Sequence, residues 1–289
     1  NEAYSRFVPK QFLDILGKES YTDVQLGDQV EKEMTILFAD IRNFTDLSES
    51  MTPVENFNFL NRYLGYMEPV IRRNNGFIDK YIGDSIMALF ETSVEDALNA
   101  AIEMRIKLTE FNQVITQFGM EPIDIGIGMH TGNLMLGVVG GEGRMDGTVI
   151  SDAVNLAARL EGLNKTYGAS IIISEDLLVK IDDASIYDYR FLDIVKVKGK
   201  KKAVYIFELL NGDSDDCRYL KMETKALFGM AIDEYRNKEF ESALKNFSAL
   251  LDKNPMDHAA LMYLKRCKEA IKHGVPDDWD GVETFLFKS

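Results

Sequence analysis

Apolar segments with strand and helix periods alternate along the first half of this sequence and restrict its fold. Residues 34–40 (MTILFAD) form a compact apolar run of strand length. A helical stripe follows, then a hairpin over residues 77–90, a second helical stripe, and a pair of strands over residues 123–130 and 133–139, joined at Thr131-Gly132. The order strand, helix, strand, strand, helix, strand predicts an α+β fold with the split, ferredoxin-like sheet.

Capping signals indicate where the two helices begin and end. Residues 52–55 (TPVE) form a capping box with proline at the first helical position, and residues 74–76 (NNG) end that helix. Residues 93–96 (SVED) open the second helix, whose apolar stripe runs toward Gly119.

Further segments extend this core. Residues 151–168 have a helical period and residues 169–174 (ASIIIS) read as a strand. A closing pair of strands is expected over residues 187–196 and 203–210, on either side of the basic turn 198–202.

The chain divides into one large domain and smaller flanking parts. We expect an N-terminal connector helix and linker over residues 1–30, one domain over 31–210, and a linker rich in Asp, Ser and Gly over 211–216. A helical segment over 217–274 and a tail over 275–289 complete the chain.

The helical segment resembles a tetratricopeptide repeat. Ala231, Ala243, Phe247 and Pro255 stand at the offsets of that repeat, and a further helix over residues 257–273 follows as a cap. A single repeat cannot bury its own apolar face, so it should pack on the preceding domain or bind a protein partner.

Composition restricts the partners. The formal charge of −14 disfavours nucleic acid and anionic membranes, because both would be repelled. No apolar run reaches the roughly 18 residues of a membrane span, and residues 1–4 (NEAY) lack a signal pattern. We expect a cytoplasmic protein, or the cytosolic part of a larger one. Cys217 and Cys267 are expected to be free thiols, and the three histidines are too scattered for a zinc site.

Two carboxylates stand where neighbouring strands should meet. Asp40 ends the first strand and Asp84 lies in the hairpin, so the split-sheet order places hard oxygen ligands side by side. A pair of Mg²⁺ ions for phosphoryl chemistry would need such ligands. For either residue alone, the capping of a turn is the more common role.

Four motifs taken together extend this interpretation. FADIRNFT (38–45), FIDKYIGD (77–84), GIGMHTG (126–132) and TVISDAVNLAAR (148–159) resemble the catalytic domain of class III nucleotidyl cyclases, over residues 31–210. The resemblance implies a homodimer with two composite sites that convert a nucleoside triphosphate to a 3′,5′-cyclic nucleotide and pyrophosphate. With ATP as substrate, the chain would be an adenylate cyclase.

The resemblance also implies roles for residues near the first strand. Asp40, Ile41 and Asp84 would hold two divalent ions, Mg²⁺ or Mn²⁺, from one subunit. The backbone that includes Phe44 and Thr45 would donate N–H groups to the terminal phosphates.

Asn155 and Arg159 are four residues apart, so both should project from one helix face. The guanidinium would stabilise the charge that builds on the reacting phosphate, and the amide would orient the ribose oxygen. Helix statistics alone favour a surface pairing of Arg159 with Asp152 or Glu161.

Base choice is expected to depend on Lys80 and Thr148. Lys80 matches the adenine-reading lysine of the family, because an ammonium can donate to N1 of adenine but faces the N1–H of guanine. Thr148 stands where mammalian-type adenylate cyclases carry Asp, and resembles a bacterial subgroup. Lys198 or Lys200 would bind phosphate.

Two alternatives to an adenylate cyclase remain open. One is a guanylate or promiscuous nucleotidyl cyclase, and the other is a non-catalytic dimeric signalling module.

Residues 140–143 (GGEG) lack the spacing of a dinucleotide fingerprint and are interpreted as a mobile loop before Arg144 and Asp146.

Overall fold

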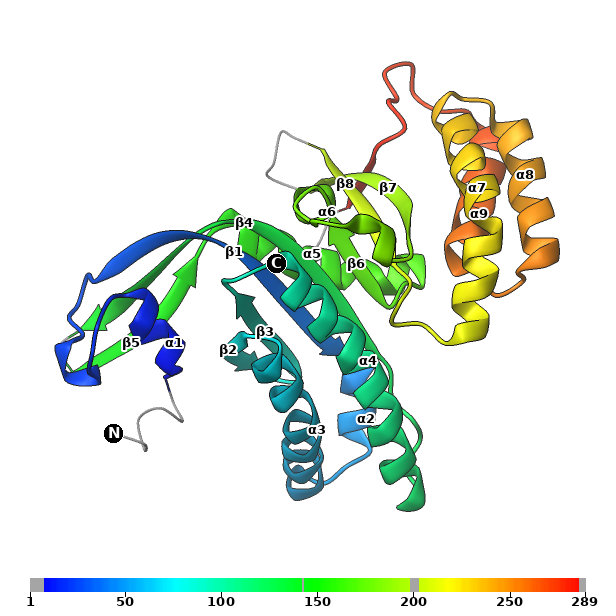
Figure 1. Cartoon of the computed structure of the whole chain (residues 1–289). Helices are drawn as coiled ribbons and strands as arrows, with labels where there is room; N and C mark the ends of the chain where they lie inside the picture. The colour runs from blue at the N-terminus through cyan, green and yellow to red at the C-terminus, as the bar shows by residue number, and fades with distance from the viewer. Residues whose placement is uncertain (1–7, 142, 198–202, 286–289) are drawn as a thin grey trace. The chain divides into compact units, whose positions relative to one another are not determined.

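The computed structural model describes residues 8–141, 143–197 and 203–285 (Figure 1). The chain forms two compact units, one of residues 1–125 and 129–158 and the other of residues 126–128 and 159–289.

The first unit is built on an antiparallel sheet. Its strands are β1 (Gln29–Ile41), β2 (Gly76–Ile82), β3 (Ser85–Phe90), β4 (Ile125–Gly141) and β5 (Arg144–Ile150). The strand order is β2-β3-β1-β4, with β5 paired to β4, and β3 runs antiparallel to both β1 and β2. This is the predicted split order, and the mixed α+β class is confirmed.

Two long helices pack on this sheet, α3 (Pro53–Arg73) and α4 (Val94–Gln117) (Figure 1). The predicted capping box is present, since Thr52 accepts from the Glu55 N–H and Glu55 accepts from the Thr52 N–H. Short helices α1 (Lys10–Ile15) and α2 (Phe44–Glu49) complete the unit. A buried cluster joins alternate residues of the sheet to Phe12 of α1 and to Ala153 and Ala157.

The prediction of two strands joined at Thr131-Gly132 was wrong, because β4 runs without a break through both residues. The Thr131 hydroxyl is buried and shares a hydrogen bond of 2.8 Å with the Thr35 hydroxyl of β1. Position 132 favours glycine because a Cβ there would lie only 3.0 Å from the Cβ of Ala153. A glycine that permits close packing was therefore mistaken for a turn.

The loop predicted over residues 140–143 is also corrected, because Gly140 and Gly141 are the last residues of β4. Arg144 and Asp146, which follow it, lie in β5, and β5 pairs residue by residue with the end of β4 from Met135 to Gly141. Strand β1 likewise begins at Gln29 rather than at residue 34, and its first half alternates between exposed and half-buried side chains. Neither the first half of β1 nor β5 contains a long apolar run, so the apolar pattern does not reveal them as strands.

The second unit joins a small sheet to a helical segment. Its sheet contains β6 (Ile171–Ser174), β8 (Val204–Leu209), β7 (Tyr189–Val197) and β9 (Glu283–Phe285), paired in that order. The closing strand pair was predicted; β9, within the expected tail, was not. The sequence also did not predict two short helices of this unit, α6 (Glu175–Leu178) and η3 (Ala184–Ile186). In the first unit it did not predict the short helix η2 (Tyr21–Asp23).

Helix α5 (Asp152–Tyr167) begins in the first unit and ends in the second. The C-terminal helices are α7 (Asp215–Arg236), α8 (Phe240–Lys253) and α9 (His258–His273). Their helical character agrees with the prediction, while the repeat type stays a prediction. Within the described ranges, none of the helices is both long and apolar enough to span a membrane.

Candidate active site

Asp40 and Asp84 come together at one end of the first sheet. The register pairs Ala39 of β1 with Ile86 of β3, and the two strands are antiparallel. Asp40, directly after Ala39, and Asp84, two residues before Ile86, therefore lie at the same end of the sheet. The backbone N–H of Ile41 donates a hydrogen bond of 3.1 Å to Oδ2 of Asp84. Asp84 occupies a two-residue turn after Gly83, whose φ of 64° requires the left-handed region. The turn therefore fixes the carboxylate against the end of β1.

Tyr63 of α3 lies beneath the two carboxylates. Its side chain is fully buried, and its hydroxyl has no hydrogen-bond partner among the residues that the structure describes. Burial raises the pKa of Tyr63, and the charges of Asp40 and Asp84 raise it further. Both acids therefore act electrostatically on the same buried group, which is consistent with the strand register that brings them to one end of the sheet.

The donor set fits divalent ions that arrive with a nucleotide. Mg²⁺ prefers oxygen ligands and is commonly bound by one or two carboxylates together with substrate phosphates. Asp40, Asp84 and the Ile41 carbonyl group supply such oxygens. Across the described parts of the chain, no group of three or more His, Cys, Asp or Glu side chains could form a metal cage. The carboxylate and carbonyl oxygens at the end of β1 are of the type that fits a divalent ion.

The turn after β1 places the predicted phosphate-binding backbone. Asn43 has a φ of 56° and precedes α2, which starts at Phe44. The Phe44 ring stacks on Phe59 of α3 at a centroid distance of 6.4 Å, and Thr45 is exposed. The Ile41 N–H donates to Asp84 and the Arg42 N–H donates to the Asp124 carbonyl oxygen at 2.9 Å, so the donors left to this turn lie after Arg42.

Lys80 lies on β2 immediately after an irregularity in the strand. The register passes from Ile78 to Lys80, so Asp79 is an extra, bulged residue. The Asp79 side chain is only 5% exposed and its carboxylate lies 3.2 Å from the Lys80 ammonium, which is 38% exposed. Burial raises the pKa of Asp79, against the lowering effect of Lys80. The bulge thus directs Lys80 outward from a buried acid.

Thr148 lies on β5 opposite Gly137 of β4 and is half-buried. The charge of Asp146, two residues earlier, contributes to the raised pKa of Asp79. The strand of Thr148 therefore lies within electrostatic reach of the bulge beside Lys80.

Asn155 and Arg159 lie on α5, as predicted. Asn155 is exposed and Arg159 is half-buried. Asn155 belongs to the first unit and Arg159 to the second. Lys198 and Lys200 lie outside the described residues.

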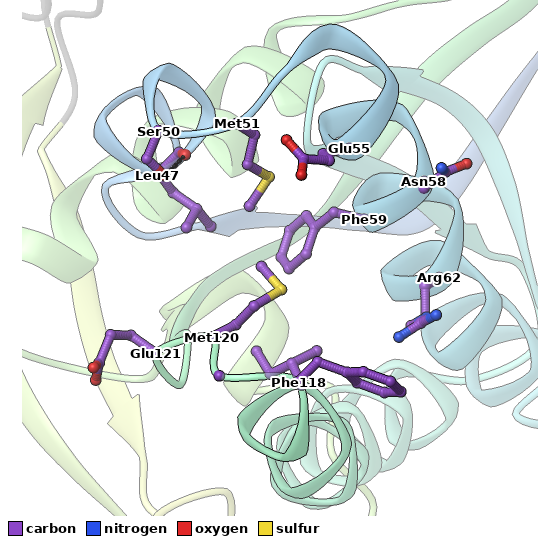
Figure 2. Close-up of a pocket in the computed structure, with 12 residues that line it drawn as sticks. Leu47, Ser50, Met51, Glu55, Asn58, Phe59, Arg62, Phe118, Met120 and Glu121 are labelled. Carbon is purple, nitrogen blue, oxygen red and sulfur yellow. Dashed lines mark hydrogen bonds between the residues drawn. The ribbon is translucent and has the colours of Figure 1, made fainter.

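A cavity of about 590 Å³ opens elsewhere in the first unit, between α2, α3 and the residues after α4. Figure 2 shows the side chains of Met51, Phe59 and Met120 pointing toward one another across it, with Arg62 and Glu121 farther out. None of the predicted site residues lines it. The chemistry expected of the carboxylates therefore does not take place in this cavity.

Tyr63 and Asp79 were missed by sequence reasoning. Tyr63 was counted only as part of an apolar helix stripe, and nothing in that period distinguishes it from a core residue. Asp79 carried a usable signal, since an acid directly before Lys80 in a strand interior contradicts strand propensity.

Comparison with known proteins agrees with this geometry. The family model described as "Adenylate and Guanylate cyclase catalytic domain" matches residues 27–210. An adenylate cyclase of Anabaena cylindrica is 44% identical over 214 residues, which cover 72% of this chain and 43% of that protein. A terminal-differentiation-specific adenylate cyclase of Dictyostelium discoideum is 38% identical over 275 residues, which cover 93% of this chain and 13% of that protein.

The chain thus spans less than half the length of these two curated relatives. The Dictyostelium alignment covers so much of the chain that it runs past residue 210 into the helical segment.

Solved structures give the same assignment. The adenylyl cyclase CyaB from P. aeruginosa is 31% identical, with a TM-score of 0.57 over 65% of this chain and 98% of its own. The guanylyl cyclase Cya2 is 34% identical, with a TM-score of 0.56 over 64% of this chain and 95% of its own. Motifs, strand order, carboxylate pair and relatives agree, and the chain belongs to the family of adenylate and guanylate cyclase catalytic domains.

Proposed function

We propose that this protein is an adenylate cyclase that converts ATP to 3′,5′-cyclic AMP and pyrophosphate. The observation that carries the proposal is the joining of Asp84 to the end of β1 by the 3.1 Å hydrogen bond from Ile41. It brings two carboxylates to one place, as a two-metal site requires. Two relatives named adenylate cyclases, at 38% and 44% identity, support ATP as the substrate.

The metal-binding groups would be Asp40, Asp84 and the Ile41 carbonyl oxygen. Two divalent ions held there, Mg²⁺ or Mn²⁺, would lower the pKa of the ribose 3′-hydroxyl and bind phosphate oxygens. In the reaction the 3′-oxygen attacks the α-phosphorus, and pyrophosphate leaves. Backbone N–H groups of Phe44 and Thr45 would bind the terminal phosphates, together with Lys198 or Lys200.

Asn155 and Arg159 would act on the reacting phosphate and ribose. The guanidinium of Arg159 carries fixed donors that suit the charge developing on the phosphate oxygens. The amide of Asn155 would orient the ribose ring oxygen. Because the residues are four apart on one helix, their side chains share a face.

Lys80 and Thr148 would read the base. The Lys80 ammonium would donate to N1 of adenine, and the Thr148 hydroxyl would accept from the adenine amino group. The buried acid Asp79 supports this role, because its carboxylate lies 3.2 Å from the ammonium and keeps it near the end of the bulge. The same ammonium would oppose the N1–H of guanine.

Cyclases of this family bind nucleotide and act as dimers. We propose that two copies of this chain form two composite sites, with Asp84 serving the site of its own chain and Lys80 the site completed by the partner. Activity per chain should then fall on dilution. We also propose a cytoplasmic location and a tetratricopeptide-like character for the helical segment.

Incubation with ATP or GTP and Mn²⁺, followed by separation of the products, tests the activity. We expect cyclic AMP from ATP, with a much lower rate from GTP. Equal rates would show a promiscuous enzyme, and a faster GTP reaction would show a guanylate cyclase. No product from either nucleotide would indicate a non-catalytic signalling module.

A further inference from the structure

The C-terminal helices contact the helix that carries Arg159. We propose that they position it: Arg266 of α9, acting through Asp193 of β7 and Tyr167 of α5, holds the C-terminal end of α5 in place. The proposal rests on the proposed function, because it takes Arg159 to be the catalytic group. All four residues lie in the second unit.

Helix α5 packs directly on the backbone of β4. A Cβ at Gly128 would lie 2.0 Å from the backbone nitrogen of Glu161, and one at Gly126 would lie 3.1 Å from the Cβ of Asn164. The Asn164 amide donates a 3.0 Å hydrogen bond to the Ile127 carbonyl oxygen. Because no side chain separates helix and strand here, the middle of α5 has a fixed distance to β4.

The C-terminal end of α5 is held by polar contacts. The buried Tyr167 hydroxyl donates a 2.6 Å hydrogen bond to Oδ2 of Asp193, which is 1% exposed. Arg266 donates to the same oxygen at 2.8 Å, and its guanidinium also lies over the Tyr167 ring. One carboxylate oxygen therefore joins α5, β7 and α9.

Helix α9 also completes an irregularity in β7. The register passes from Phe191 to Asp193, which leaves Leu192 as an extra, bulged residue. The carbonyl oxygen of Leu192 accepts a 2.8 Å hydrogen bond from the fully buried Tyr263 of α9. The bulge that turns Asp193 toward Tyr167 is thus satisfied by the helical segment.

A buried ion network fixes α9 to the sheet. Arg190 of β7, 1% exposed, donates to both oxygens of Asp257 at 2.6 and 3.0 Å and to Glu208 of β8 at 2.8 Å. Its guanidinium lies 4.2 Å from the ring centroid of Phe228 on α7. Lys221 of α7 donates to Glu208 at 2.5 Å. Loss of one partner would leave a buried charge uncompensated, so α7 and α9 are needed for the stability of the second unit.

The contacts at Tyr167 bear on Arg159 because α5 is a continuous helix. Arg159 precedes Tyr167 by eight residues, which is about 12 Å along a helix. A misplacement of about 1 Å at a reacting group can lower a rate about a hundredfold. Arg266 is therefore a positioning residue for Arg159.

The test compares Arg266→Met, which keeps the length of the side chain but removes the guanidinium, with Arg266→Lys and Tyr167→Phe. Steady-state kinetics with Mn²⁺ and ATP should show kcat about tenfold to a hundredfold lower in Arg266→Met, with KM changed less than about twofold. Arg266→Lys should recover most of kcat, because an ammonium can still pair with Asp193. The exposed Lys268 of α9 provides a matched control, and Lys268→Met should behave as wild type.

Hydrogen exchange reports on the same variants without activity. Amides of α5 after Arg159 should exchange faster in Arg266→Met and in Tyr167→Phe, whereas those of α3 should be unchanged. A folded Arg266→Met protein with wild-type kcat overturns the proposal. If that variant does not fold, wild-type kcat and exchange in Tyr167→Phe overturn it instead. An inactive wild-type protein would refute the proposed function. The hydrogen-exchange result would still test whether Arg266 and Tyr167 hold the C-terminal end of α5.

Discussion

Ile41 and Asp84 are 43 residues apart in sequence, and the backbone N–H of the first donates to Oδ2 of the second at 3.1 Å. This bond crosses from the end of β1 to the hairpin turn. It uses one lone pair of Oδ2 of the Asp84 side chain. The orientation of Asp84 is therefore set by backbone, before any ion binds.

We expect Asp40→Asn and Asp84→Asn each to lower kcat at least about a hundredfold, because the amide retains the shape but removes the charge that would bind a metal. Both proteins should keep the wild-type circular dichroism spectrum. Substantial activity in either variant would contradict the two-metal assignment. Asp46→Asn, an exposed acid on the neighbouring α2, is the control.

Composite sites make a prediction about mixtures. Chains with Asp40→Ala and chains with Arg159→Ala should each be inactive, whereas a mixed dimer should contain one intact site. Recovery should approach a quarter of wild-type activity per chain when the two are mixed equally, because about half of the dimers are mixed. Demonstrated subunit exchange without recovery would argue against sites shared between chains.

Lys80→Glu is expected to change base preference. A carboxylate can accept from the N1–H of guanine but repels the acceptor N1 of adenine, so the ratio of kcat/KM for GTP to that for ATP should rise at least about tenfold. Lys107→Glu, on the surface of α4, should leave the ratio unchanged. An unaltered ratio in Lys80→Glu would show that another residue reads the base.

Tyr63→Phe tests the buried hydroxyl beneath the carboxylates. Because that hydroxyl has no hydrogen-bond partner among the described residues, its removal should leave the free energy of unfolding equal or higher, by up to about 1 kcal/mol. Urea unfolding of the metal-free protein measures the change. A clear loss of stability would show that the hydroxyl is bonded to the carboxylates in solution.

Acid should weaken the attachment of α9. Burial alone would raise the pKa of Asp257, but hydrogen bonds and charge from Arg190 lower it below the ordinary value of about 3.9. A carboxyl group with a lowered folded pKa stabilises above its unfolded pKa, and that stabilisation is lost as pH falls through the folded pKa.

The free energy of unfolding should therefore decrease as pH falls below about 4, and less steeply in Asp257→Asn. At pH 7 the same substitution should cost about 3 to 5 kcal/mol, because it leaves Arg190 without one of its buried partners. Urea titrations at pH 7, 5 and 3.5 on both proteins measure this. Parallel pH dependences would contradict the role of Asp257.

Local patterns were sufficient for much of the fold. The capping box at Thr52 and the apolar stripe of α3 are determined within a few residues, and their prediction was confirmed. Gly132 was misread because its glycine serves packing against Ala153, which a sequence window does not contain. The first half of β1 and most of β5 are exposed or half-buried and mix polar with apolar side chains, so their pairing rather than their composition makes them strands.

The candidate site likewise contains residues that the sequence predicts and residues that only the structure reveals. Asp40, Asp84 and Lys80 stand in short motifs, and the structure places Asp40 and Asp84 at one sheet end and Lys80 on the same hairpin as Asp84. The bulge at Asp79 depends on the pairing of β2 with β3, and the position of Tyr63 depends on how α3 packs. Neither has a signature within a single segment.

The buried ion network also affects the order in which the second unit can fold during synthesis. Arg190 meets Asp257 only 67 residues later, and Asp193 meets Arg266 only 73 residues later. At about 5 to 20 residues per second, a ribosome releases β7 several seconds before Asp257 and Arg266. During that interval the sheet can form and Arg190 can pair with Glu208, but Arg190 still lacks Asp257 and Asp193 still lacks Arg266. The second unit therefore reaches its final packing only once α9 has left the ribosome.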